Sequence, residues 1–281
     1  MQLFSQILKL IPRTDFERMV KATGAEYRSK GLSSWSQFVG MLFCQLGRAH
    51  SLREIEGGLK SCEGKLARLG IEAPARSSLS YANGHRPWEL FEKVFYGLFE
   101  TVAAKAVGKK KFRFKNKLVS IDSTVIDLCL SMYDWAKFRR TKGAVKLHLL
   151  RRVEAIREDT GGILVFITNH HGLGVSTIAA IYKDRWQIEL FFKALKQNLK
   201  IKTFVGASAN AVKTHIWTAL ISMLLLRYLQ LASRFGWSLA NLVALLRMNL
   251  FTYRDLMAWL DKPCATPPDP QGNPQANLAF A

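Results

Sequence analysis

The sequence predicts an α+β or α/β protein in which a helical region comes first, a region with strands follows and helices return at the end. Three observations predict this order. Residues 1 to 105 carry repeated helix-start signals and apolar residues at helical spacing. Residues 118–129 and 144–150 are rich in β-branched residues in partly alternating order, which is typical of strands. Helical spacing returns after Ser176.

Two start signals stand out in the first region. Ser51 and Glu54 have the spacing of a capping box, and Pro87 stands where a first helical turn tolerates proline. Six apolar residues at helical spacing follow that proline, namely Leu90, Phe91, Val94, Phe95, Leu98 and Phe99. Residues 51–86 fit either a DNA-binding helix-turn-helix or a plain bundle with a basic surface. Their basic residues are Arg53, Lys60, Lys65, Arg68, Arg76 and Arg86.

The strand region predicts a hairpin in which residues 151–157 and 163–168 flank the turn Asp159-Thr-Gly-Gly162. Beyond it, helices are expected from about Ser176 to Lys200, from Asn210 to about Arg234, from Ser238, and from a box at Thr252 to Asp255. The most apolar run, residues 216–226, is too short for a membrane span of ~20 residues and predicts a buried core helix. Residues 262–281, rich in proline and small polar residues, predict a disordered tail.

The charge indicates a polyanionic partner. Lys and Arg number 41 against 21 Asp and Glu, a formal net charge of +20. Nucleic acid is the first choice, because cations that neutralise phosphates release counterions; an anionic membrane surface is the second. Residues 109–117 hold six basic residues in nine, including Lys109, Lys110, Lys111 and Arg113. This run is either a solvated linker or a phosphate-contacting segment at a domain boundary.

The cysteines indicate neither a disulfide framework nor a zinc site. Cys44, Cys62, Cys129 and Cys264 are scattered, without C-x-x-C spacing. Buried reduced thiols in a cytoplasmic protein are the simpler interpretation. The N-terminal residues lack a small-residue cleavage site, so we expect no signal peptide and no membrane partner.

One carboxylate, Glu189, lies among cations in YKDRWQIELFFKALKQNLK, residues 182–200. On a helix it shares a stripe with Tyr182, Arg185, Lys193, Lys196 and Lys200, beside an apolar stripe of Ile188, Phe191, Phe192, Leu195 and Leu199. It is therefore either a surface ion-pair partner of Arg185 and Lys193, contributing ~0.2 to 0.5 kcal/mol per pair, or a ligand amid phosphate-binding cations.

Asp122 is the best candidate for a second ligand. It lies near the end of a strand-like run and is flanked by Ser120, Ser123 and Thr124. An acid at the end of an apolar strand suits a metal site, although a turn or edge-strand aspartate gives the same pattern. Asp127 falls on the other side of a continuing strand and is the weaker candidate.

The spacing of Tyr182, Arg185, Glu189 and Lys196 resembles the Y-R-E-K signature of DDE insertion-sequence transposases of the IS-four branch. Residues 120–150 resemble that family's first catalytic strand and the strand after it. The resemblance implies an RNase H-like domain with a five-stranded mixed sheet, in which three acids hold two divalent metals, Mg²⁺ or Mn²⁺. Asp122 would be the first acid and Glu189 the third. Tyr182, Arg185 and Lys196 would contact phosphates of the transposon end.

The resemblance also implies partners and a domain plan. Double-stranded DNA, both transposon ends and target, would be the substrate, and a homodimer the active form. The expected domains are a helical DNA-binding domain at 1–107, a basic linker at 108–117, the catalytic domain at 118–261 and the tail at 262–281.

The pattern breaks at the second acid, which in the family ends a buried strand and precedes Arg-Gly and an aromatic residue. None of the available aspartates, Asp127, Asp134, Asp159 or Asp184, has that context. Residues 144–158 run 15 residues without Gly, Pro or Asn, although strands usually run ~5 to 6 residues. We interpret Leu150-Arg151 as the junction left by an internal deletion of the third strand, a helix and the strand with the middle aspartate.

Two acids in place of three would impair catalysis. The chain is thus expected to be either an impaired DNA transposase or a non-catalytic DNA-binding remnant of one. A third reading, an RNA-binding or ribosome-associated basic protein, accounts for the charge but not for Asp122 together with the signature spacing.

Overall fold

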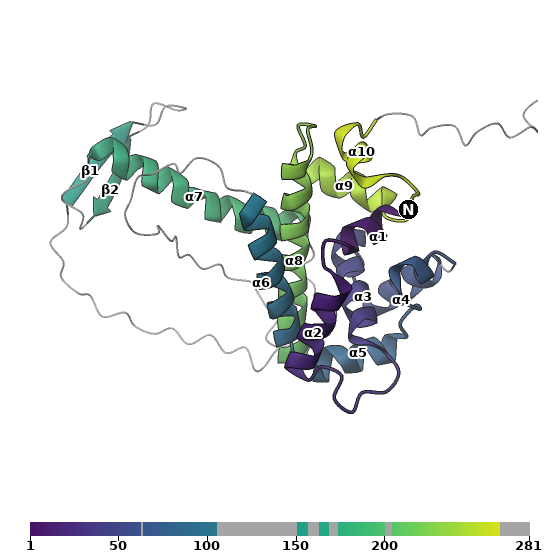
Figure 1. The fold of residues 1–281 in the computed structure, drawn as a ribbon. Helices are drawn as coiled ribbons and strands as arrows, with labels where there is room; N and C mark the ends of the chain where they lie inside the picture. The colour runs from purple at the N-terminus through teal and green to yellow at the C-terminus, as the bar shows by residue number, and fades with distance from the viewer. Residues whose placement is uncertain (63, 106–150, 157–162, 169–173, 200–203, 265–281) are drawn as a thin grey trace, which may run out of the picture. The chain divides into compact units, whose positions relative to one another are not determined.

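The computed structural model describes residues 1–62, 64–105, 151–156, 163–168, 174–199 and 204–264 (Figure 1). The chain divides into two compact units. The first is formed by residues 1–109 together with residues 198–281, and the second by residues 110–197.

The first unit is helical throughout its described part. Its helices are α1 (Leu3–Leu8), α2 (Arg13–Thr23), α3 (Ser34–Gly47), α4 (Leu52–Lys60), the 3-10 helix η1 (Leu66–Leu69), α5 (Arg76–His85), α6 (Glu89–Lys105), α8 (Ala209–Ala232), α9 (Leu239–Asn249) and α10 (Leu256–Asp261).

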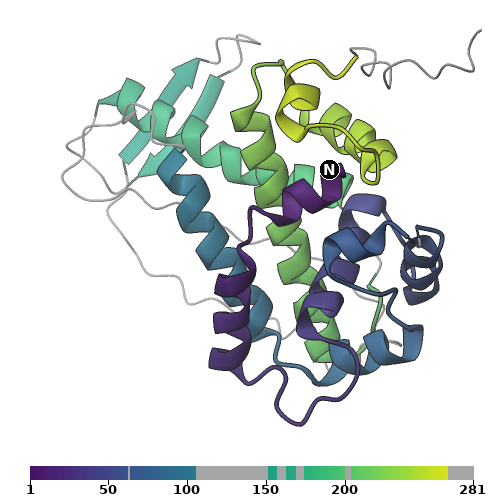
Figure 2. The same ribbon diagram turned by 45° about the vertical axis from the view of Figure 1, so that its right-hand side comes forward.

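Helix α8 is the centre of this unit. It packs on α3, α5, α6 and α9, and both ribbon views show it beside α6 (Figures 1 and 2). Two of its buried hydroxyls bond within the helix, since Thr218 Oγ1 donates to the carbonyl of Thr214 at 2.7 Å and Ser222 Oγ to that of Thr218 at 2.8 Å. The predicted buried core helix is confirmed. By length and composition α8 could also cross a bilayer, and 50% of its most apolar window is buried.

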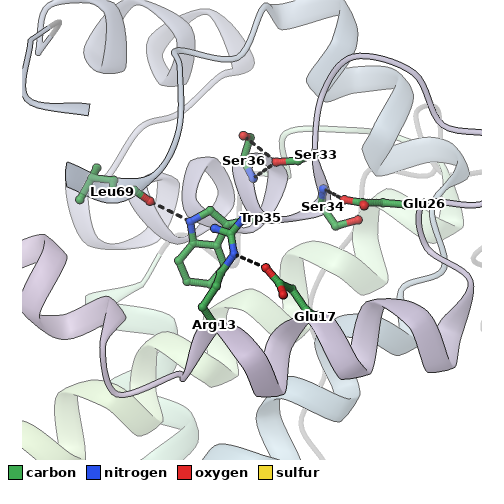
Figure 3. Close-up of polar contacts among 8 residues, drawn as sticks. All are labelled: Arg13, Glu17, Glu26, Ser33, Ser34, Trp35, Ser36 and Leu69. Atoms are coloured by element: carbon green, nitrogen blue, oxygen red, sulfur yellow. Dashed lines mark hydrogen bonds and ion pairs between the residues drawn. The ribbon is translucent and has the colours of Figure 1, made fainter. Parts of the chain in front are cut away.

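Trp35 anchors an aromatic cluster between α2 and α3. Its indole N–H donates to the carbonyl of Leu69 at 2.8 Å, and the Arg13 guanidinium lies 4.5 Å from its ring centroid (Figure 3). Phe16 and Phe38 contact the same ring. The Ser33 hydroxyl caps α3 by accepting the Ser36 N–H, as Figure 3 also shows. The Leu69 carbonyl thus accepts the N–H at the edge of the Trp35 ring, and the Arg13 cation covers the face of that ring.

The predicted start signals in the first region are largely confirmed. Ser51 caps α4 by accepting the Glu54 N–H at 3.2 Å, while the Glu54 carboxylate accepts the N–H of His50 at 2.9 Å. In the apolar stripe of α6, the buried residues are Leu90, Phe91, Val94 and Leu98. Phe95 is half-buried, and Phe99, at the end of the stripe, is exposed.

The first and last helices of the unit are joined. The N–H of Leu3 donates to the carbonyl of Thr252 at 3.1 Å, and that of Phe4 to the carbonyl of Leu250 at 2.8 Å. The expected start of the last helix at Thr252 was wrong. Helix α10 begins three residues later, because Asp255 caps it by accepting the Ala258 N–H at 2.8 Å. The Thr252 hydroxyl instead donates back to the carbonyl of Asn249.

The compact units divide the chain differently from the expected domain plan. That plan assigned residues up to 261 to the strand-containing domain, whereas α8, α9 and α10 belong to the unit of the N-terminal helices. The physical reason is the apolar surface of α8, which α3, α5 and α6 cover.

The second unit contains β1 (Arg151–Ile156), β2 (Ile163–Thr168) and most of α7 (Val175–Asn198). The strands pair antiparallel from Arg151 opposite Thr168 to Ile156 opposite Ile163, as the predicted hairpin requires. The predicted strands at 118–129 and 144–150, the basic linker and residues 265–281 of the predicted tail lie outside the described residues. The expected five-stranded sheet therefore stays a prediction.

The described cysteines differ in exposure. Cys44 is buried, Cys62 is half-buried and Cys264 is exposed, while Cys129 lies outside the described residues. The expectation of buried thiols holds for Cys44 and is wrong for Cys264. Burial raises the pKa of the Cys44 thiol to about 12.

This pKa leads to a prediction about thiol reactivity. At pH 8 Cys44 holds almost no thiolate, the form that attacks disulfide reagents, so we expect it to react only after denaturation. Titration with a chromogenic disulfide would check this. Cys44→Ser should leave the fast-reacting thiols unchanged, whereas Cys264→Ser should remove one. A fast thiol lost in Cys44→Ser would contradict the buried placement.

Candidate nucleic-acid interface

The signature residues lie on one unbroken helix. Tyr182, Arg185, Glu189, Lys193 and Lys196 all belong to α7. At 100° per residue they occupy an arc of about 80° along one side. The predicted helical register of the signature is therefore confirmed, and one carboxylate lies along a line of cations. Lys200 lies outside the described residues.

The exposure of this stripe suits contact with a ligand. Tyr182, Glu189 and Lys196 are half-buried, and Lys193 is exposed. Half-buried carboxylates and ammonium groups keep one side toward solvent while their stems pack against the protein. In the neighbouring apolar stripe, Leu195 is buried on α7 and Leu199 just beyond it. A stripe of this kind can hold phosphate oxygens beside a metal-binding carboxylate.

The acids that would complete a metal site are not among the residues described. Asp122 lies in the undescribed segment, as do Asp127, Asp134 and Asp159. Asp184 lies on α7, about 140° around the helix from Glu189. Within the described ranges, no three His, Cys, Asp or Glu side chains gather in a way that could hold a metal ion. Glu189 is thus the one predicted ligand that the structure places, and its carboxylate has the oxygen donors that Mg²⁺ prefers.

The basic residues predicted between 51 and 86 fall into two groups. Arg53, Lys65, Arg68 and Arg76 are exposed, and Lys60 is exposed while bonded to Glu56 at 2.7 Å. Arg86 is not the surface cation that the sequence suggested. It is 8% exposed, and its guanidinium donates to Gln37 Oε1 at 3.3 Å, to Ser29 Oγ at 2.7 Å and to the carbonyl of Leu32. Arg86 therefore joins the end of α5 to α3 and to the loop before α3 by buried and partly buried hydrogen bonds.

Sequence reasoning missed the polar network around Arg86. Gln37 of α3 donates to Asn83 Oδ1 of α5 at 2.9 Å. Asn210 of α8 donates to the carbonyls of Asn83 at 2.8 Å and Arg86 at 2.6 Å. No local pattern marks these residues, because each polar group finds its partner on a distant helix. The network fixes the C-terminal end of α5.

The comparisons with known proteins agree with the helical signature. Residues 109–225 match the transposase DDE domain, and residues 1–72 match a domain of unknown function (DUF4372). The chain is 39% identical over 119 residues to "Putative transposase y4zB" of Sinorhizobium fredii. The chain is therefore similar to DDE transposases of insertion sequences over part of its length. The matched DDE segment contains all of α7 and so every signature residue.

Two further relatives of the chain carry insertion-sequence names. It is 37% identical over 78 residues, 28% of its length, to "Probable transposase for insertion sequence element IS5377" of Geobacillus stearothermophilus. It is 33% identical over 89 residues, 32% of its length, to "Putative transposase for insertion sequence element IS4SA" of Synechocystis. No solved structure matches the chain.

These alignments are partial. The match to the Sinorhizobium protein covers 42% of this chain and 33% of that relative. The other two matches cover 21% and 26% of their relatives. The chain thus spans a third or less of the length of the curated relatives it matches.

Proposed function

We propose that this chain is a DDE transposase that binds the ends of its insertion sequence as double-stranded DNA and acts on their phosphodiester bonds with the help of Mg²⁺ or Mn²⁺. The observation that carries the proposal is the line of Tyr182, Arg185, Glu189 and Lys196 on one side of α7, inside the segment that matches the DDE domain. A line of cations along a rigid helix can follow a phosphate backbone.

Each residue has a defined role in this proposal. Glu189 and Asp122 would hold the metal, and the metal when bound would activate the attacking hydroxyl and stabilise the leaving oxygen. Tyr182, Arg185, Lys193, Lys196 and Lys200 would contact phosphates near the reacting bond, and Lys109, Lys110, Lys111 and Arg113 would contact phosphates from the linker.

A second candidate function is a DNA-binding transposase remnant without cleavage. This candidate is favoured because no aspartate between Asp122 and Glu189 precedes Arg-Gly and an aromatic residue, the sequence in which the family's second acid stands. A homodimer in the active complex and a cytoplasmic location are part of both proposals. Both proposals require DNA binding, and only the first requires cleavage.

Binding to the element's own end tests what the two share. In a gel-shift assay at several salt concentrations, we expect Lys193→Ala and Lys196→Ala to weaken binding and each to lower the slope of log affinity against log salt by roughly 1, the value for one lost phosphate contact. Lys183→Ala is a matched control, because Lys183 is an exposed lysine of α7 about 100° around the helix from Tyr182.

Absence of binding by the wild-type chain even at low salt would overturn both candidate functions. An unchanged slope in both lysine variants would show that the α7 stripe does not follow the backbone.

A further inference from the structure

Helix α5 has an exposed polar side that the signature on α7 does not involve. Its inner side is formed by Leu79, Ala82 and Asn83, all buried. Its exposed residues are Arg76, Ser77, Ser78, Ser80, Tyr81 and His85. No residue of α5 is acidic. This side combines hydroxyl and imidazole groups, which both donate and accept hydrogen bonds, with one large aromatic ring.

Side chains from other helices fix α5 at both ends. At its start, the N–H of Arg76 donates to the Glu56 carboxylate of α4 at 3.1 Å. At its end, Asn210 donates to the carbonyls of Asn83 and Arg86. These bonds hold the helix in one position, so the exposed side chains of α5 are presented in a fixed arrangement. Recognition of a ligand requires side chains that are positioned in this way.

Two exposed rings on α5 are already ordered. Tyr81 and His85 stack with their centroids 4.0 Å apart and an interplanar angle of 15°. His85 Nδ1 lies 2.9 Å from the carbonyl of Tyr81, and this contact fixes the ring orientation. Tyr81 is 67% exposed. Because the side chains of Tyr81 and His85 are already ordered, they lose less conformational entropy when they bind a partner.

Exposed cations flank both ends of α5. Arg76 is its first residue. Arg28 and Lys30 lie in the loop before α3, which the bond from Arg86 to Ser29 holds beside the C-terminal end of α5. Cations on both sides of an acid-free polar helix match the charge pattern of duplex DNA, where phosphates border a groove lined with base edges.

We propose that α5 enters the major groove of duplex DNA and reads base edges through Ser77, Ser80, Tyr81 and His85. Arg76, Arg28 and Lys30 contact the phosphates on either side. The groove is about 12 Å wide and accepts one α-helix. The proposal rests on the proposed DNA-transposase function. It adds the residues that recognise the base sequence of the DNA.

Selection from a library of duplexes with a randomised core tests the proposal. We expect the full wild-type chain to enrich one motif. Tyr81→Ala and Ser80→Ala should each lose about tenfold or more of the discrimination between that motif and a shuffled duplex, with non-specific affinity within about twofold of wild type. Arg28→Ala and Lys30→Ala should weaken both duplexes equally. Tyr96→Ala is the control, since Tyr96 is an exposed tyrosine of α6 away from α5.

The outcomes separate the two proposals. Binding without any enriched motif, or full discrimination in both the Tyr81 and Ser80 variants, would overturn the role of α5 and leave the proposed function standing. No binding to any duplex at low salt would overturn the proposed function and, with it, this inference. Thermal unfolding of each variant, expected to match wild type because these side chains are exposed, shows that a lost motif is not a lost fold.

Discussion

Purified wild-type chain is expected to cleave duplexes carrying the ends of its insertion sequence roughly a hundred- to a thousandfold more slowly than a transposase with three acids. With two carboxylates in place of three, one metal position would be weakly held. The metal contribution to transition-state stabilisation is several kcal/mol, and each ~1.4 kcal/mol is a factor of ten in rate. Single-turnover strand cleavage with Mg²⁺ or Mn²⁺ measures the rate directly.

Glu189→Gln is the companion variant in that assay. It keeps the size of the side chain on α7 and removes the charge that would bind the metal. We expect residual cleavage to fall to background while DNA binding is retained. Wild-type cleavage at the rate of a three-acid enzyme would contradict the proposed loss of the middle acid. Unchanged residual cleavage in Glu189→Gln would contradict its role as a metal ligand.

Arg86→Ala is expected to cost about 3 kcal/mol of the free energy of unfolding. The substitution removes a buried guanidinium and leaves Gln37 Oε1, Ser29 Oγ and the carbonyl of Leu32 without the donor they share. Gln37 is fully buried, and a buried polar group left unsatisfied costs about 1 to 3 kcal/mol, whereas the exposed Ser29 can bond to water instead. Urea denaturation followed by circular dichroism would measure the change.

Arg76→Ala provides the comparison for that experiment. Arg76 is an exposed arginine at the other end of α5, where only its backbone N–H bonds to Glu56. Its loss should change stability by less than about 0.5 kcal/mol. Equal effects of the two substitutions would mean that the network around Arg86 does not stabilise the fold.

Local patterns predicted most of the helices. The Ser51 cap, the proline before α6 and the apolar run of α8 each depend on neighbours within a few residues, so their signals are readable in sequence. The spacing from Tyr182 to Lys196 is likewise local, and α7 carries it in one register.

Long-range contacts could not be predicted in this way. Arg86 looked like a surface cation because its partners, Gln37, Ser29 and Leu32, lie about 50 residues away in sequence. The Thr252 box failed for a different reason. Asp255 lies three residues further on and also has a capping side chain, and the bonds from Leu3 to Thr252 and from Phe4 to Leu250 fix the segment before it.

The first unit is built from both ends of the chain, and residues 110–197 are inserted within it. Damage confined to the insertion therefore leaves the bonds between α1 and the segment before α10 intact. If α5 reads the DNA as proposed, such damage removes cleavage and the phosphate contacts of α7, but it keeps the contacts that α5 makes with the element's ends. A chain of this kind, made beside an intact transposase of the same element, would occupy those ends and withhold them from the active enzyme.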